Sequence, residues 1–201
     1  MSQLKVEILD KSIEYQGFFK LLSYRLRHAL FGGGMSRELR REVFERGHAV
    51  GVLPYDPERD EVVLVEQFRV GALDAPQGPW LMEIIAGMIG PGETPQEVAV
   101  REAQEEAGCR IKELLPVAHY FSSPGGSTEQ VTVFLARTST AGLGGIHGLA
   151  DEGEDIRVHV LPVDRALALL DSGVICAALP IIALQYLGLH RERLRGDWLE
   201  T

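Results

Sequence analysis

The segment from Thr94 to Gly108 is the part of the sequence that most constrains the fold of this chain. Thr94 and Glu97 form the T-x-x-E pattern of a capping box, in which the two residues satisfy each other's backbone N–H groups at the start of a helix. Pro95 takes the favoured first helical position, and Gly108 is placed to end the helix. These signals predict a helix over about 95–107.

Three glutamates crowd onto one side of this predicted helix. At about 100° per residue, Glu102, Glu105 and Glu106 fall within an arc of about 100°. Like charges at this spacing destabilise a helix by roughly a few tenths of a kcal/mol per pair, and Arg101 can offset only part of that. A solvated acidic surface is one explanation. A magnesium site is the other, because Mg²⁺ prefers oxygen ligands and is typically held by a couple of carboxylates while it touches substrate phosphates.

The rest of the chain mixes predicted strands with two more predicted helices. Residues 22–26 alternate between apolar and polar, as in a half-buried strand. Helical spacing recurs over 164–173 and about 178–195, with Gly173 and Gly188 as possible stops. Residues 37–47 favour helix by propensity but could pair as a strand. Short β-branched or aromatic runs predict further strands at 48–55, 61–68, 80–86, 119–121, 130–136 and 156–163. This order predicts a sheet covered by helices on both faces.

Composition excludes several classes of protein. A length of 201 residues suits one core-bearing domain and a smaller appendage, and a net charge of −9 disfavours a nucleic-acid surface, which needs clustered Lys and Arg. The longest apolar stretch, residues 174–189, is too short for a membrane span, and the charged N-terminus lacks the apolar core of a signal peptide. Two cysteines suit a reducing compartment. We expect a cytoplasmic protein that binds neither nucleic acid nor membranes.

The acidic segment belongs to a longer pattern. Gly87, Glu93 and the run Arg101–Cys109 match G-x5-E-x7-R-E-U-x-E-E-x-G-U, where U is a small or apolar residue. Seven fixed identities give a chance match of about 10⁻⁸ per position. The pattern resembles the signature of the Nudix hydrolases. The resemblance implies an α+β fold, an α/β/α sandwich with a mixed sheet, and hydrolysis of a nucleoside diphosphate linked to another group.

The resemblance is strongest to the ADP-ribose pyrophosphatase branch of this family. In the loop SSPGGSTE (122–129), Pro124 follows Cys109 by fifteen residues, an offset seen in that branch, although the same residues also suit an ordinary turn. The stretches RREVFERGHAV, VEQFRVGA, WLMEIIAGMI and GIHGLADEGEDIRVHVL agree with it. It implies a small antiparallel β domain over 1–47 and a catalytic domain over 48–201. It further implies a homodimer that exchanges its N-terminal domains, and strands rather than a helix around 37–47.

Roles at the metal site are carried over residue by residue. The resemblance assigns Glu102 and Glu106 as ligands of Mg²⁺, with Mn²⁺ as a possible replacement, and Glu105 as a supporting carboxylate. Glu93 and Arg101 would pair and orient the helix. Further ligands would be Glu154 and the carbonyl of Ala86, and Glu152 would be the base that activates water. Without the resemblance, the acidic loop 151–155 reads as solvated surface.

Roles in substrate binding are carried over in the same way. Arg41 and Arg69 would hold the phosphates through paired charge-assisted hydrogen bonds, although surface salt bridges are the alternative. The other positions could equally be packing and turn residues. In the family, Phe18 and Phe19 would pack on adenine, and Met88, Ser123 and Glu129 would contact the terminal ribose.

The expected reaction is hydrolysis of ADP-ribose to AMP and ribose 5-phosphate. One alternative is a sugar-nucleotide pyrophosphatase acting on GDP-mannose, whose relatives share an SPGG-type loop. Another is a ligand-sensing module without catalysis, which the complete set of signature glutamates and the absence of a basic DNA-binding segment disfavour.

Overall fold

The computed structural model describes residues 4–149, 151 and 153–200, which form two compact units. The smaller unit joins the N-terminal segment up to His48 with Tyr120–Gln130. The larger unit contains Ala49–His119 and the chain from Val131 onward. No helix in the described residues is long and apolar enough to cross a membrane.

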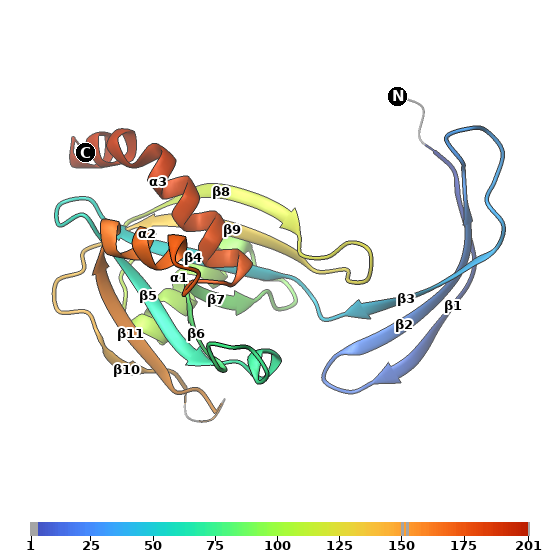
Figure 1. Ribbon diagram of the computed structural model, residues 1–201, viewed down its shortest axis with the longest axis horizontal. Helices are drawn as coiled ribbons and strands as arrows, with labels where there is room; N and C mark the ends of the chain where they lie inside the picture. Colours follow the sequence, from blue (N-terminus) through green and yellow to red (C-terminus); the bar gives the residue numbers. More distant parts are fainter. Residues whose placement is uncertain (1–3, 150, 152, 201) are drawn as a thin grey trace. The chain divides into compact units, whose positions relative to one another are not determined.

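The smaller unit is built on a three-stranded antiparallel sheet, in the order β1 (Val6–Gln16), β2 (Lys20–His28) and β3 (Leu39–Glu45) (Figure 1). The segment 37–47 therefore contains a strand, as the family resemblance implied, despite its helical propensity. Leu39 pairs with Leu26, and Val43 pairs with Leu22, so the apolar positions of β3 align with those of β2. Cross-strand packing overrides local propensity here.

The loop 120–130 completes the smaller unit by returning to the end of β3. The N–H of Phe44 donates to the carbonyl of Gly126 at 2.8 Å, and the N–H of Thr128 donates to the carbonyl of Phe44 at 3.2 Å. Two segments that are about eighty residues apart in sequence are thus joined by backbone hydrogen bonds.

The larger unit contains a mixed sheet in the order β10-β11-β5-β4-β9-β8, in which β6 also pairs with β5 and β7 with β4. The β4–β9 pair is parallel, and β4 and β5 form an antiparallel hairpin across the turn 57–60. The strands are β4 (Ala49–Asp56), β5 (Glu61–Phe68), β6 (Trp80–Glu83), β7 (Ile85–Met88), β8 (Glu113–Phe121), β9 (Gln130–Arg137), β10 (Gly145–His147) and β11 (Ile156–Pro162), with a 3₁₀ turn at Val70–Ala72.

Helices cover both faces of this sheet (Figure 1). On one face, Val50 and Val52 of β4 share a buried cluster with Val98 of α1 (Pro95–Ala107). On the other face lie α2 (Val163–Asp171) and α3 (Ala178–Leu199), where the ring of Tyr55 lies 6.0 Å from that of Trp198. Since β4 has apolar side chains on both sides, it is buried almost throughout. The expected α/β/α sandwich with an added N-terminal sheet is confirmed.

Two details of the prediction were wrong. The run 80–86 is two strands, because the chain leaves β5 after Glu83 and joins β4 from Ile85. Gly188 does not end a helix and instead lies within α3. A Cβ placed on Gly188 would meet a methyl carbon of Leu167 at 3.3 Å, so glycine here serves the close packing of α3 on α2.

Enlarging Gly188 should therefore separate the two helices. We expect Gly188→Leu to lower the free energy of unfolding by about 1–3 kcal/mol through overpacking. Gly196 offers a matched control on the same helix, since a Cβ there meets nothing within 4 Å. Gly196→Leu should leave stability unchanged or raise it by up to about 1 kcal/mol through helix propensity. Urea unfolding of both variants measures the difference, and equal effects would contradict the packing role.

Candidate active site

The helix that carries the glutamates begins and ends where the sequence predicted. Both bonds of the capping box are present: the N–H of Glu97 donates to the hydroxyl of Thr94 at 3.3 Å, and the N–H of Thr94 donates to the carboxylate of Glu97 at 2.8 Å. Gly108 ends the helix with a φ of 62°, in the left-handed region that glycine adopts easily. Local signals alone thus fix the segment that presents the acidic side chains.

Arg101 forms ion pairs with three glutamates on or beside this acidic face. Its guanidinium lies 3.4 Å from Glu93, 3.0 Å from Glu102 and 2.9 Å from Glu105. Glu93 also accepts a hydrogen bond from the N–H of Gly90 at 2.8 Å, which ties the loop before the helix to the helix itself. The expected pairing of Glu93 with Arg101 is therefore present.

Glu106 is the most deeply buried carboxyl of the group, with 2% of its surface exposed. Its pKa is raised to about 8, chiefly by burial and also by the neighbouring charges of Glu102 and Glu154. A backbone N–H from Ala86 at 3.3 Å and the charge of Arg69 act in the opposite direction. The pKa of Glu102 is also raised, chiefly by burial. The site thus holds like charges in a partly dry environment.

Two glycines allow the backbone to approach these carboxylates. A Cβ on Gly87 would lie 2.0 Å from an oxygen of Glu102, so any side chain at the first position of the signature would force Glu102 to move. A Cβ on Gly148, whose φ is 101°, would lie 2.7 Å from the Cβ of Glu154. The β7 backbone therefore lies against the acidic face of α1, and the loop before β11 folds closely on itself at Glu154.

The donor set fits a hard cation, but the side chains do not form a finished cage. Among the described residues, no three Asp, Glu, His or Cys side chains already converge on one point as metal ligands. The reason is local pairing, because Glu102 lies against Arg101 and the carboxylate of Glu154 accepts from the N–H of Leu149 at 3.0 Å. Buried carboxylates with raised pKa values have few cations to balance them, and a divalent cation would relieve their repulsion.

Arg69 lies beside the same carboxylates and is held by a residue that sequence reasoning missed. Glu83 accepts from the Nε of Arg69 at 2.6 Å and has a side chain only 14% exposed. Since this bond uses Nε, it leaves the terminal nitrogens of the guanidinium for another anion. A lone glutamate in a strand gives no signal in a sequence, so only the fold reveals this pairing.

The predicted residues of the smaller unit gather partly around Arg46. Phe19 stacks edge-on against Phe18 at 4.7 Å, and the guanidinium of Arg46 lies 5.3 Å from the Phe19 ring. Arg46 also lies 3.2 Å from Glu129, so Phe19 and Glu129 are brought together by a residue that was not predicted. Phe18 is 87% exposed, which leaves its ring open to a ligand.

The remaining predicted residues are more dispersed. Arg41 pairs across the sheet with Tyr24 and donates to the carbonyl of Arg40. The carbonyl of Ser123 accepts from two N–H groups of its own loop, as in a turn. Met88 is the exposed last residue of β7. Glu152, the predicted base, lies outside the described residues.

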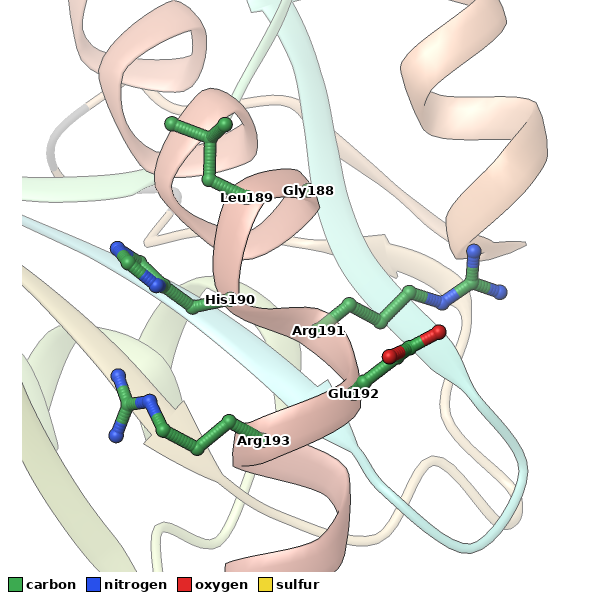
Figure 2. Close-up of a pocket in the computed structure, with 6 residues that line it drawn as sticks. All are labelled: Gly188, Leu189, His190, Arg191, Glu192 and Arg193. Carbon is green, nitrogen blue, oxygen red and sulfur yellow. The ribbon is translucent and has the colours of Figure 1, made fainter.

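A hollow of about 460 Å³ lies along α3, and none of these residues lines it. Figure 2 shows His190 and Arg193 on one side of the helix and Arg191 and Glu192 on the other, so the side chains do not converge. Arg191 is also bonded to Asp60. This hollow is helix surface, and it offers no second site.

The acidic helix, its glycine approaches and the mixed sandwich together define the class of protein. The model of the NUDIX domain family matches residues 45–176. The chain belongs to the NUDIX family.

Comparison with individual proteins that match most of the chain adds detail to this family assignment. The chain is 50% identical to the ADP-ribose pyrophosphatase of Escherichia coli (strain K12) over 193 residues, which cover 96% of this chain and 92% of that protein. It is 42% identical to the ADP-ribose pyrophosphatase of Haemophilus influenzae, over 98% and 92% of the two chains. It is 34% identical to the GDP-mannose pyrophosphatase of Enterobacter sp. (strain 638), over 92% and 95%. A crystal structure of an ADP compounds hydrolase shares the fold, with a TM-score of 0.71 and 23% identity over 98% of both chains.

The buried charge on Glu106 should make the metal-free protein less stable as pH rises. Because its pKa is raised from 4.5 to about 8, folding takes up a proton, so its contribution to stability is full below pH 4.5 and lost on passing pH 8. We expect the free energy of unfolding to fall by up to about 1.4 kcal/mol per pH unit within this window. Glu106→Gln should remove this slope.

Urea unfolding between pH 5 and pH 9 in the presence of a chelator measures the slope. Glu113→Gln, at an exposed carboxyl on β8, is the matched control and should retain the wild-type slope. An identical pH dependence in wild type and Glu106→Gln would show that Glu106 is already ionised in the folded protein.

Proposed function

We propose that this protein hydrolyses ADP-ribose to AMP and ribose 5-phosphate. The observation that carries the proposal is the buried acidic face of α1, where Glu106 is 2% exposed and Gly87 leaves room for Glu102. Such a face costs stability, and carboxyls with perturbed pKa values gather at functional sites, here one that suits chemistry on a linked pair of phosphates. The similarity to two ADP-ribose pyrophosphatases, at 50% and 42% identity, supports this choice of substrate.

The metal in this proposal is Mg²⁺, for which Mn²⁺ could substitute. Glu102, Glu106, Glu154 and the carbonyl of Ala86 would hold it. Oxygen donors alone suit these hard cations. When bound, the metal would neutralise charge on the diphosphate and so favour attack by water.

The protein's own residues would orient the substrate and manage the proton. Arg69, fixed through its Nε by Glu83, would direct its terminal nitrogens at one phosphate, and Arg41 would hold the other. Glu152 would accept a proton from water as the new P–O bond forms and the bridging P–O bond breaks. Glu105 would support the cluster through its bond to Arg101. Phe18 and Phe19 would pack on adenine, and Met88, Ser123 and Glu129 would contact the terminal ribose.

Kinetics with a nucleotide panel test this proposal. GDP-mannose is the alternative substrate, because the chain is 34% identical to a GDP-mannose pyrophosphatase. With Mg²⁺ present, we expect kcat/KM to be higher for ADP-ribose than for GDP-mannose. Glu106→Gln should lower kcat by orders of magnitude while the protein stays folded, because the proposed metal site loses its most buried carboxylate ligand. Glu152→Gln should lower kcat with little change in KM.

Near-normal turnover in Glu106→Gln would reject its role at the metal, and an unchanged kcat in Glu152→Gln would assign the base elsewhere. A higher kcat/KM for GDP-mannose would identify the protein as a GDP-mannose type pyrophosphatase instead. If no nucleotide released a product, a ligand-sensing module without catalysis would be favoured.

We also propose that the protein is a homodimer in the cytoplasm that exchanges its N-terminal domain, residues 1–47. The sheet of the smaller unit supports this, because Ile8 pairs with Leu26 and Ile13 with Leu22, and a β-bulge keeps both isoleucines on one face. Ile8 is 63% exposed and Ile13 is 54% exposed. A three-stranded sheet gains stability when such a face is covered. Two free cysteines suit a reducing compartment.

Light scattering at micromolar concentration should give twice the mass of one chain. The double variant Ile8→Lys/Ile13→Lys should shift the protein towards a monomer, because it buries two charges in the proposed interface. Leu189→Lys, at an 81% exposed position on α3, is the control and should remain a dimer. A wild-type monomer at this concentration would contradict the proposal.

A further inference from the structure

Gln67, near the end of β5, is a buried polar residue without an evident structural role. It is 7% exposed, and within the described part of the chain its Nε2 has no hydrogen-bond partner. Buried side-chain amides normally find partners, because leaving a buried donor unpaired costs free energy. An unpaired donor that a fold retains therefore points to a partner that binds later.

The register of the sheet places Gln67 on the face covered by α1. Val63 and Val65 of β5 pack in the same buried cluster as Val98 of α1, and residues two apart on a strand share a face. Gln67 continues this row. The extended backbone at Arg69, with φ −128° and ψ 108°, continues it by one more step. Gln67 is thus the residue between the core and Arg69.

The two strands beside β5 connect Gln67 to the candidate site. On one side, β6 pairs Val65 with Glu83 and Gln67 with Leu81, so Glu83 shares the face of Gln67. On the other side, the pairing of β11 with β5 ends at Arg157 and Glu66, so Ile156 and Gln67 are the residues that follow the last pair. Ile156 lies two residues after Glu154.

The carboxylates of this neighbourhood already have donors of their own. Glu83 accepts from Arg69 at 2.6 Å, Glu154 from the N–H of Leu149 at 3.0 Å, and Glu106 from the N–H of Ala86 at 3.3 Å. None of these carboxylates accepts a hydrogen bond from Nε2 of Gln67, so we look for the acceptor in a ligand. A phosphate oxygen meets this need, because it is an anionic acceptor that suits the place beside Arg69.

We propose that the buried side chain of Gln67 turns towards the site when substrate binds, and that its amide then donates a hydrogen bond to a non-bridging oxygen of the diphosphate, next to the guanidinium of Arg69. Gln67 is then a substrate-binding residue. The inference rests on the proposed function, since it needs a diphosphate at this site. It adds a neutral donor to the phosphate contacts, and such a donor strengthens binding without changing the charge of the cluster.

The test replaces Gln67 with methionine, which has nearly the same length and shape but no donor. We expect kcat/KM for ADP-ribose to fall about 10- to 100-fold, the range expected for one lost hydrogen bond to a charged group. Affinity for ADP-ribose with a methylene group in place of the bridging oxygen should weaken by a similar factor. The melting temperature should stay level or rise, because the buried unpaired donor is gone. Gln67→Glu, which places another anion beside the phosphates, should bind more weakly still.

Gln77→Met is the matched control. Gln77 is an exposed amide that donates to the sulfur of Cys176 at 2.9 Å, and its replacement should change neither activity nor affinity. A Gln67→Met variant that melts several degrees lower with unchanged kcat/KM would overturn the inference and make Gln67 a structural residue. Unchanged melting with unchanged affinity would overturn it as well. If the wild type releases no AMP from ADP-ribose, the proposed function itself fails, whereas an active wild type confines the failure to Gln67.

Discussion

The repulsion among carboxylates at the end of α1 is the constraint on which the rest of the larger unit depends. Glu102 and Glu106 lie in the last turns of a helix, where the macrodipole already disfavours negative charge, and this last turn contains no basic residue. The fold holds them there by other means. A capping box fixes the first turn, Arg101 spans three glutamates, and apolar residues of α1 pack against β4 and β5. The energy of packing is used to keep like charges together.

Features with local causes could be predicted from the sequence. The bounds of α1 follow from Thr94, Glu97 and Gly108, all within fifteen residues. The break between β6 and β7 could not be predicted, because it depends on which neighbouring strand each half joins. Gly188 was misread for a similar reason, since its role is to face Leu167 on another helix. Long-range contacts decide such cases, and propensity carries no information about them.

In the candidate site, too, some residues could be predicted from the sequence and others could not. The signature identifies the acidic face of α1, because its residues are close in sequence and their spacing is specific. Glu83 and Gln67 are single polar residues in strands, and their importance depends on cross-strand register and burial. A polar residue in a predicted buried strand is the one signal that could have singled out Gln67. The resemblance to a family supplied roles for the smaller unit, but it did not reveal Arg46 between Phe19 and Glu129.

The return of the loop 120–130 to β3 has a consequence for how the chain is made. The N-terminal strands leave the ribosome first, yet Phe44 must wait for Gly126 and Thr128 to be synthesised before its backbone is fully paired. At about 5–20 residues per second, this delay lasts on the order of several seconds. The exposed strands of the nascent chain are open to wrong pairings during that time. Cleavage of the chain after His48 would likewise leave residues 120–130 without the sheet on which they fold.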